Sequence, residues 1–187
     1  MAQKRKNWNG LISGFSASDL VFLDESGCNT DMTRRYAYSF GGSRAVDSAP
    51  LSKPKNTTIL SSIQLNGTLH YTTFSGGTTV ERFKRYLETD LLPHLNGNSV
   101  LIMDNMKSHH ARAVKNLLDS LGIRYIYLPP YSPDLNPIEK LWSKVKAFLR
   151  KFKARTLDAL PNAIQNAFHS VTVSDCSGWF LFCGYAL

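Results

Sequence analysis

Short apolar runs separated by turn residues dominate the first half of the chain and predict β-strands. The first run, residues 20–23, leads into Asp24-Glu25-Ser26-Gly27, a sequence typical of a buried strand that ends in a turn. Further strands are expected at residues 36–40, 57–65 and 69–74. Because the Asn66-Gly67 pair between the last two runs is a strong hairpin signal, the first half is predicted to form an antiparallel meander.

In the second half, helical periodicity alternates with short apolar strands. A helix capped by Thr78 and Thr79 is expected to run through residue 92 and to bury one apolar face. Strands are predicted at residues 99–103 and 123–128, and helices at residues 109–121, 137–152 and 156–171. Gly122 is a natural helix terminator, and Pro137 suits a first helical position. The order β-β-β-β-α-β-α-β-α-α predicts an α/β fold, one mixed sheet with helices packed on its faces.

Charge adds a preference for the kind of partner. The 187 residues are 43% apolar and 19% charged, which is enough to bury a core. Lys and Arg number 22 against 14 Asp and Glu, leaving a net charge of +8. This excess favours a polyanionic partner, nucleic acid first and an anionic membrane second.

Several protein classes are excluded by composition. The longest uncharged run near the end, residues 176–187, is too short to span a bilayer, so no membrane-spanning role is expected. The basic N-terminal stretch is not followed by the apolar segment of a secretory signal. The three cysteines, Cys28, Cys176 and Cys183, form no CxxC pair, which favours a reducing, cytoplasmic location.

Three carboxylates stand out by their positions in the predicted fold. Asp24 ends the first strand, Asp104 ends the strand at 99–103, and Glu139 lies in the first turn of the helix from 137. Ligands of open α/β sheets gather at the carboxyl ends of strands, so these acids are expected to converge. Hard divalent cations such as Mg²⁺ take a few carboxylate oxygens, and two such ions support in-line phosphoryl displacement.

Each acid also has an ordinary structural explanation when it is taken singly. Aspartate is common in turns after strands, and an acid in the first helical turn interacts favourably with the helix dipole. Glu25 follows Asp24 and is expected to point to the opposite face of the strand, which leaves it at most a supporting role.

The helix from 137 carries a basic flank beside Glu139. Its apolar residues recur at intervals of three and four and predict a buried stripe that includes Trp142, with Glu139 just off one edge. Lys146, Arg150 and Lys153 continue that flank, and the stretch 140–155 holds seven basic residues and no acid. A solvated surface is one explanation, and a path for a DNA phosphate backbone is the other.

Three motifs together carry a family resemblance. LVFLDESG, VLIMDNMKSHH and YLPPYSPDLNPIEKLWSKVK resemble the catalytic domain of DDE transposases of the mariner superfamily, most closely the bacterial insertion-sequence type. The 34 residues between Asp104 and Glu139 match the Asp-Asp-Glu branch. The resemblance implies a ribonuclease-H-like, mixed five-stranded sheet flanked by helices. It also implies two Mg²⁺ or Mn²⁺ ions and cut-and-paste transposition in a homodimeric complex with transposon-end and target DNA.

Residue by residue, the family's catalytic and metal-binding acids fall on Asp24, Asp104 and Glu139. Asn105 and His109 match its D-N-x-x-S-H stretch, and Asn136 lies in its proline loop. Asn105, His109 and Asn136, together with Glu25, are expected to lie next to the catalytic acids and to orient them. The predicted DNA contacts are Lys146, Arg150 and Lys153. The segment 36–44 departs from a basic, proline-rich pattern usual in the family.

The resemblance covers residues 20–187, and residues 1–19 are expected to form a basic extension too short for the family's helix-turn-helix region. The chain is therefore expected to be the second reading frame of a split element or a truncated copy, with an upstream helix-turn-helix polypeptide as a further partner. Two rival functions stay open: a stand-alone metal nuclease of the same fold, and a non-catalytic DNA-binding remnant.

Overall fold

The computed structural model describes residues 2–34, 36–48, 50–51 and 54–185, so the last two residues of the predicted 20–187 domain lie outside them. Its sheet has the strand order β3-β2-β1-β4-β5. The strands are β1 (Leu20–Cys28), β2 (Thr57–Gln64), β3 (Leu69–Ser75), β4 (Val100–Met103) and β5 (Arg124–Tyr127). β1, β2 and β3 pair antiparallel, whereas β4 pairs parallel with both β1 and β5. The predicted mixed, five-stranded sheet is confirmed.

β1 is longer than predicted, and the expected turn at residues 24–27 is wrong. The antiparallel ladder to β2 continues from Asp24, opposite Ser61, to Cys28, opposite Thr57. The parallel ladder to β4 stops earlier, at Leu23 and Met103. Because β2 still pairs with this half of β1, the backbone stays extended through residues that favour turns elsewhere. Asp24 therefore lies inside a strand, at the point where the neighbour β4 ends.

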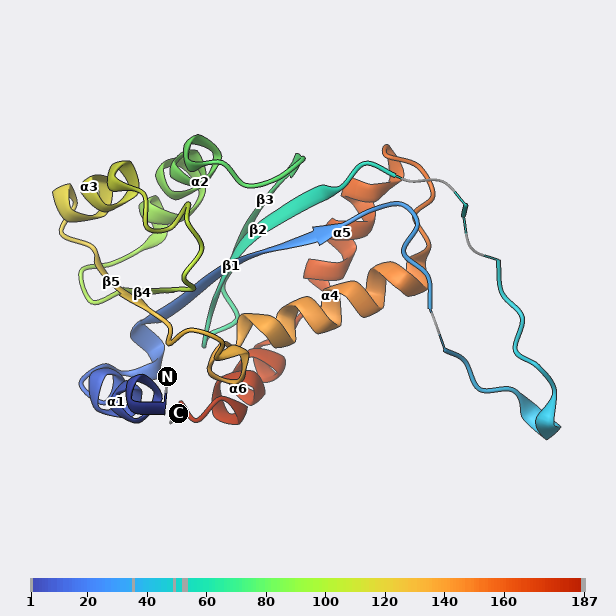
Figure 1. Ribbon diagram of the computed structural model, residues 1–187, viewed down its shortest axis with the longest axis horizontal. Coiled ribbons are helices and arrows are strands. Elements are labelled where there is room, and N and C mark those ends of the chain that lie inside the picture. The colour runs from blue at the N-terminus through green and yellow to red at the C-terminus, as the bar shows by residue number, and fades with distance from the viewer. Residues whose placement is uncertain (1, 35, 49, 52–53, 186–187) are drawn as a thin grey trace.

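The predicted strand at residues 36–40 is also wrong. This stretch belongs to the long connection from β1 to β2, residues 29–56, whose described residues project from the body of the molecule as an arm (Figure 1). Tyr36, Tyr38 and Phe40 are at least 92% exposed, and Gly41 and Gly42 turn the tip with positive φ angles. Alternating aromatic residues favour a strand only beside a partner, and the arm lies beyond the sheet. The meander therefore has three strands.

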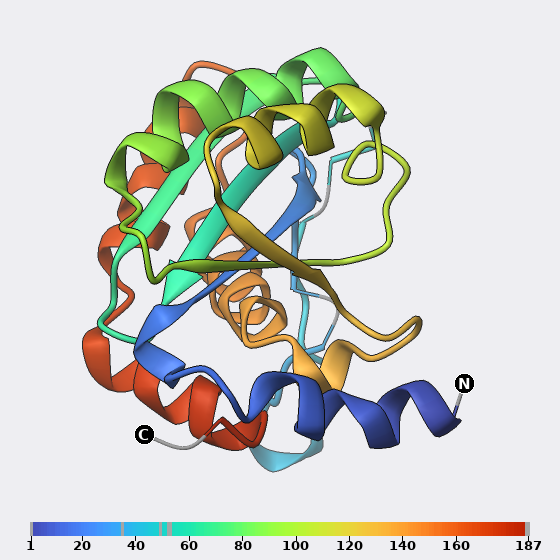
Figure 2. The same ribbon diagram turned by 90° about the vertical axis from the view of Figure 1, so that its left-hand side faces the viewer.

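Helices cover both faces of the sheet (Figures 1 and 2). One face packs on α4 (Ile138–Phe152), α5 (Ala159–His169), α6 (Val173–Phe182) and α1 (Ala2–Ile12). The other packs on α2 (Val80–Tyr86), the π-helical turn Leu87–Leu91 and α3 (Arg112–Ser120). Along β1, Leu20 and Phe22 face the first layer, whereas Val21 and Leu23 face the second. This alternation places Asp24 on the α4 side and Glu25 on the α2–α3 side.

Several element boundaries depart from the prediction while the elements themselves are confirmed. The helix predicted from 109 begins at Arg112 and ends before Gly122, whose φ is +65°. α4 begins at Ile138, with Pro137 as the residue just before it. The predicted Asn66-Gly67 hairpin joins β2 to β3, and a Cβ on Gly67 would lie 3.0 Å from Val173 Cγ2. Gly67 therefore serves both the turn and the close approach of α6.

The N-terminal extension is helical where it is described. In α1, Trp8 is 3% exposed and joins the core on the α4 side of the sheet. The Arg5 guanidinium donates to Ser132 Oγ at 2.9 Å and forms an ion pair with Asp134, so α1 contacts the proline loop. Across the described residues, the structure contains no helix with the length and apolar character needed to cross a membrane.

Candidate active site

The two aspartates are brought together by the pairing of β1 with β4. Leu23 lies opposite Met103 in the parallel ladder, so Asp24 and Asp104 are the next residues along two neighbouring strands. Asp24 is only 9% exposed. Its Oδ1 accepts the Glu25 N–H at 2.8 Å, and its Oδ2 accepts the Trp142 indole N–H at 3.3 Å. Trp142 is buried as predicted, and it also orients the first acid.

Glu139 completes the acidic group from the other side. It is the second residue of α4, and its backbone N–H donates to Asn136 O at 3.1 Å. The three predicted acids, Asp24, Asp104 and Glu139, line one cavity of about 480 Å³, which we call the acidic cavity. The proline loop, residues 129–137, forms much of the remaining wall through residues 129–133 and Asn136. Residues from β1, the end of β4 and the start of α4 therefore line the same cavity.

The electrostatics of the acidic cavity disfavour three unaccompanied negative charges. Burial, followed by the negative charge of Asp104, raises the pKa of Asp24 to about 7, and Glu25 and Glu139 add to the rise. The pKa of Asp104 is shifted in the opposite direction, below its usual value. Partial burial alone would raise its pKa, but the His109 ring, whose Nδ1 lies 2.8 Å away, and a hydrogen bond from the Met106 N–H outweigh burial and lower it.

Behind the cavity, His109 joins two carboxylates. Its ring is fully buried, with Nδ1 2.8 Å from Asp104 Oδ1 and Nε2 3.1 Å from Glu25 Oε2. Burial would lower the pKa of His109, but hydrogen bonding to Asp104 and Glu25 raises it to about 9. The ring also packs on Phe83, at 4.3 Å between centroids. Glu25 therefore lies on the opposite face from Asp24, as predicted, and reaches Asp104 through His109.

The two predicted asparagines lie at the wall of the acidic cavity. Asn105 Nδ2 donates to Leu128 O at 2.6 Å, which ties the end of β4 to the segment after β5. Asn136 is 4% exposed, and among the described residues its Oδ1 has no hydrogen-bond partner. A buried acceptor without a donor is costly unless something else satisfies it. The Asn136 amide oxygen is therefore an unsatisfied acceptor in a residue that lines the acidic cavity.

The donor set of the cavity fits a hard divalent cation. Carboxylate oxygens from Asp24, Asp104 and Glu139, with the Asn136 amide oxygen, are the ligand types that Mg²⁺ and Mn²⁺ prefer. A cation would compensate for the burial of the Asp24 charge and for its repulsion by Asp104, which together raise the pKa of Asp24. In the part of the chain that the structure describes, no three His, Cys, Asp or Glu side chains converge closely enough to hold an ion as they stand.

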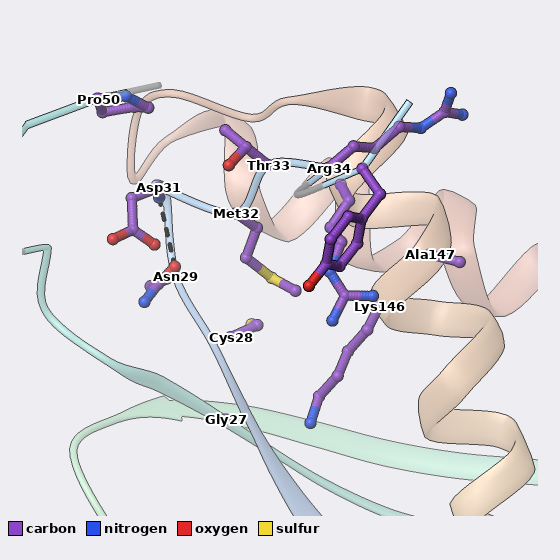
Figure 3. A pocket seen from close by; sticks show the side chains of 12 residues that line it. Gly27, Cys28, Asn29, Asp31, Met32, Thr33, Arg34, Pro50, Lys146 and Ala147 are labelled. Carbon is purple, nitrogen blue, oxygen red and sulfur yellow. Dashed lines mark hydrogen bonds between the residues drawn. The ribbon is translucent and has the colours of Figure 1, made fainter. Parts of the chain in front are cut away.

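The predicted DNA contacts on α4 divide into two groups. Lys146 and Arg150 line a second, larger pocket, shown in Figure 3. The Lys153 ammonium instead lies 2.6 Å from both carboxylate oxygens of Asp47, in the arm. Met32 and Arg34 of the arm also line this pocket, and neither was predicted as a functional residue. The basic Arg34-Arg35 pair is the one sequence feature that could have pointed to this pocket. The pair alone was not enough, because the sequence does not show that the arm passes beside α4.

Comparison with known proteins assigns the chain to a family. The family model described as "DDE superfamily endonuclease" matches residues 19–161. The chain is 28% identical over 97 residues to the transposable element Tc1 transposase of Caenorhabditis elegans, a match that covers 50% of this chain and 36% of that protein.

Solved structures give the same result for the fold. The chain is similar to a pre-cleavage Mos1 transpososome, with a TM-score of 0.77, 19% identity, and coverage of 97% of this chain and 58% of that chain. It is also similar to the catalytic domain of Mos1 mariner transposase, with a TM-score of 0.72, 17% identity, and coverage of 96% and 85%. The chain thus spans little more than half the length of the Mos1 chain in the transpososome, and about a third of the Tc1 transposase.

The architecture is therefore a ribonuclease-H-like mixed sheet of the kind found in the Mos1 catalytic domain. The chain belongs to the DDE superfamily endonucleases, and part of its sequence is similar to that of the Tc1 transposase.

Proposed function

We propose that this chain is the catalytic domain of a metal-dependent DNA transposase, which cleaves and joins strands at transposable-element ends by in-line phosphoryl transfer. One observation carries the proposal: Asp24, Asp104 and Glu139, from three separate elements, line a single cavity. The Tc1 relative, itself a transposase, supports the DNA substrate. The net charge of +8 suits a polyanion.

Each acid has a defined part in this proposal. Asp24, Asp104 and Glu139 would hold two Mg²⁺ or Mn²⁺ ions, the metals named for two Mos1 paired end complexes. When bound, the ions supply activation of the attacking oxygen and stabilisation of the leaving oxygen. Trp142 holds the Asp24 carboxylate through its indole N–H, and His109 holds Asp104. These contacts fix both carboxylates on a rigid sheet before the substrate arrives.

The same site would serve two successive reactions. In the first, water attacks a phosphodiester at the element end, and the leaving group is a 3′-hydroxyl that takes up a proton. In the second, that 3′-hydroxyl attacks a phosphodiester of target DNA and releases another 3′-hydroxyl. Neither step needs a covalent protein–DNA bond. Lys146 and Arg150, farther along α4 than Glu139, draw the phosphate backbone toward the acids.

A gel assay separates this function from its two rivals. The substrates are a labelled, pre-cleaved element end carrying a free 3′-hydroxyl, and a supercoiled plasmid as target. Joining of the label to the plasmid supports the transposase. Nicking of the plasmid without joining would instead indicate a stand-alone nuclease. A mobility shift with neither product, in Mg²⁺ and in Mn²⁺, would indicate a non-catalytic DNA-binding remnant and contradict the proposal.

The assembly around this domain is part of the same proposal. We infer an element of the bacterial insertion-sequence type, acting in the cytoplasm as a homodimer on paired ends. End recognition would come from an upstream helix-turn-helix polypeptide. Sequencing the DNA that flanks the gene tests this directly. A helix-turn-helix reading frame between inverted repeats would support it, and flanks without repeats would contradict it.

A further inference from the structure

A large pocket lies between the base of the arm and α4, apart from the acidic cavity. Its volume is about 920 Å³, within the range of small-molecule sites, roughly 300–1,000 Å³. Gly27, Cys28 and Asn29 form one side, where β1 leads into the arm, and Lys146, Ala147 and Arg150 form the other. We call it the arm pocket. In Figure 3 the Lys146 side chain extends from α4 across the pocket toward β1.

The arm pocket combines positive charge with a soft apolar wall. Lys146 and Arg150 supply two cations from one helix. Burial raises the pKa of the Cys28 thiol to about 11, and the nearby Lys146 charge opposes that rise, so the ammonium and the thiol share this space. Met32 points into the pocket beside them (Figure 3). Thioether and thiol sulfur are polarisable groups that pack well on flat aromatic rings.

The base of the arm is fixed by contacts at the end of α4. The Arg155 guanidinium donates to Thr30 O and Met32 O, both at 3.1 Å. Lys153 pairs with Asp47 on the returning side of the arm. Within the base of the arm itself, the Asp31 N–H donates to Asn29 Oδ1 at 3.3 Å. The wall that carries Met32 is therefore held in place by named contacts, although the arm's tip is exposed.

The arm pocket lies along the same helix as Glu139. At 1.5 Å of rise per residue, Lys146 and Arg150 are about 10 and 16 Å beyond Glu139 along α4. A strand in a duplex advances about 3.4 Å per nucleotide, so this is a distance of roughly three to five nucleotides. A DNA strand whose reacting phosphate lies at the acids can therefore reach the pocket with a nucleotide a few positions away.

We propose that the arm pocket binds one unpaired nucleotide of a DNA strand, its phosphate on Lys146 and Arg150 and its base against Met32 and Cys28. This inference rests on the proposed function, because it gives the DNA substrate a second point of attachment. A phosphate alone would leave most of 920 Å³ unused. A base inside a duplex is stacked on both faces and paired along its edge, so only an unpaired base can enter a pocket. Base contact with soft and aromatic side chains is tolerant of sequence.

The test measures binding of the full chain to DNA in chelator, so that no cleavage occurs. Three fluorescent probes are compared by anisotropy: a short oligothymidylate strand, an abasic strand of the same length and charge, and a duplex. The variants are Lys146→Gln, Arg150→Gln and Met32→Ser, and the matched control is Lys151→Gln. Lys151 is an exposed lysine of the same helix that does not line the pocket. Unfolding temperatures establish that each variant is folded.

The inference predicts that wild type binds oligothymidylate more tightly than the abasic strand, and that Met32→Ser removes this preference. Lys146→Gln and Arg150→Gln each weaken oligothymidylate binding by about tenfold, the usual cost of a lost charged hydrogen bond. Each also lowers the slope of log affinity against log salt by about 0.7. Lys151→Gln changes affinity by less than about twofold.

Two results would overturn the inference. Equal affinity of wild type for the abasic and oligothymidylate strands would show that the pocket does not bind the base. Equal affinity of the Lys146 and Arg150 variants and the Lys151→Gln control for oligothymidylate would show that it does not bind the phosphate. Because binding is measured without metal, a chain that passes these tests but neither nicks nor joins DNA would refute the proposed function and not the pocket.

Discussion

Replacing Asp24 with asparagine is expected to stabilise the metal-free protein, against the usual effect of changing a buried residue. The pKa of Asp24 is raised from 3.8 to about 7, a shift of about three units at about 1.4 kcal/mol each. A carboxyl whose pKa is higher in the folded state loses folding stability as pH rises from about 4 to about 7. The charged Asp24 therefore costs about 4 kcal/mol above pH 7.

The asparagine avoids this cost but loses one hydrogen bond. Both Asp24 oxygens accept N–H groups, from Glu25 and from Trp142, and an amide offers only one oxygen for the two. The lost hydrogen bond destabilises the variant by about 1–2 kcal/mol, which offsets part of the roughly 4 kcal/mol gained by removing the charge. The net gain of about 2–3 kcal/mol corresponds to roughly 5–10 °C in unfolding temperature for a domain of this size. The gain should disappear below about pH 3, where Asp24 is neutral in both the folded and the unfolded state.

Divalent metal is expected to narrow the difference in stability between the variant and the wild type. With a dissociation constant of about 1 mM, Mg²⁺ at about 10 mM stabilises the wild type by about 1.4 kcal/mol, or roughly 3–6 °C. The Asp24→Asn variant lacks one ligand and should gain much less. Thermal melts of both proteins at about pH 8, in chelator and in Mg²⁺ at matched ionic strength, measure this. A variant that melts below wild type in chelator, or that gains equally from Mg²⁺, would refute the reasoning.

Three further predictions concern cleavage and DNA binding. Asp104→Asn or Glu139→Gln should abolish strand cleavage with an unchanged circular dichroism spectrum, and cleavage at the wild-type rate would show that these acids are not catalytic. His109→Gln should raise the Mg²⁺ concentration for half-maximal cleavage by about tenfold or more; the exposed His110→Gln is the control, and equal effects of the two would contradict a positioning role. The chain alone should bind DNA with strong salt dependence and little sequence preference, which titrations of element-end and random duplexes across salt will measure.

Hydrophobic periodicity predicted the local structure correctly where the contacts of a residue are with neighbours close in sequence. The α4 stripe with Trp142 and the Asn66-Gly67 hairpin follow from local spacing, and the structure has both. The convergence of Asp24 and Asp104 was also predictable, since both follow apolar runs that form neighbouring strands.

What the sequence could not reveal depends on distant partners. Whether Asp24 lies in a turn or a strand is decided by β2, more than thirty residues away in the chain, and the aromatic residues at 36–40 lack such a partner. Glu25 and Asp104 both contact His109, and Glu25 lies 84 positions before His109 in the chain. No local pattern indicates this contact, although the family resemblance singled out Asp104 and His109, and the alternation along the first strand singled out Glu25.

The central claim, that Asp24, Asp104 and Glu139 together hold divalent cations, is tested most directly by locating Mn²⁺ in a crystal. The measurement is anomalous scattering from crystals of the wild-type chain grown with Mn²⁺, with Glu139→Gln as the comparison. We expect anomalous peaks in the acidic cavity, each about 2.0–2.4 Å from carboxylate oxygens of the three residues, and their weakening in the variant. Peaks only elsewhere on the protein, or unchanged peaks in the variant, would contradict the account.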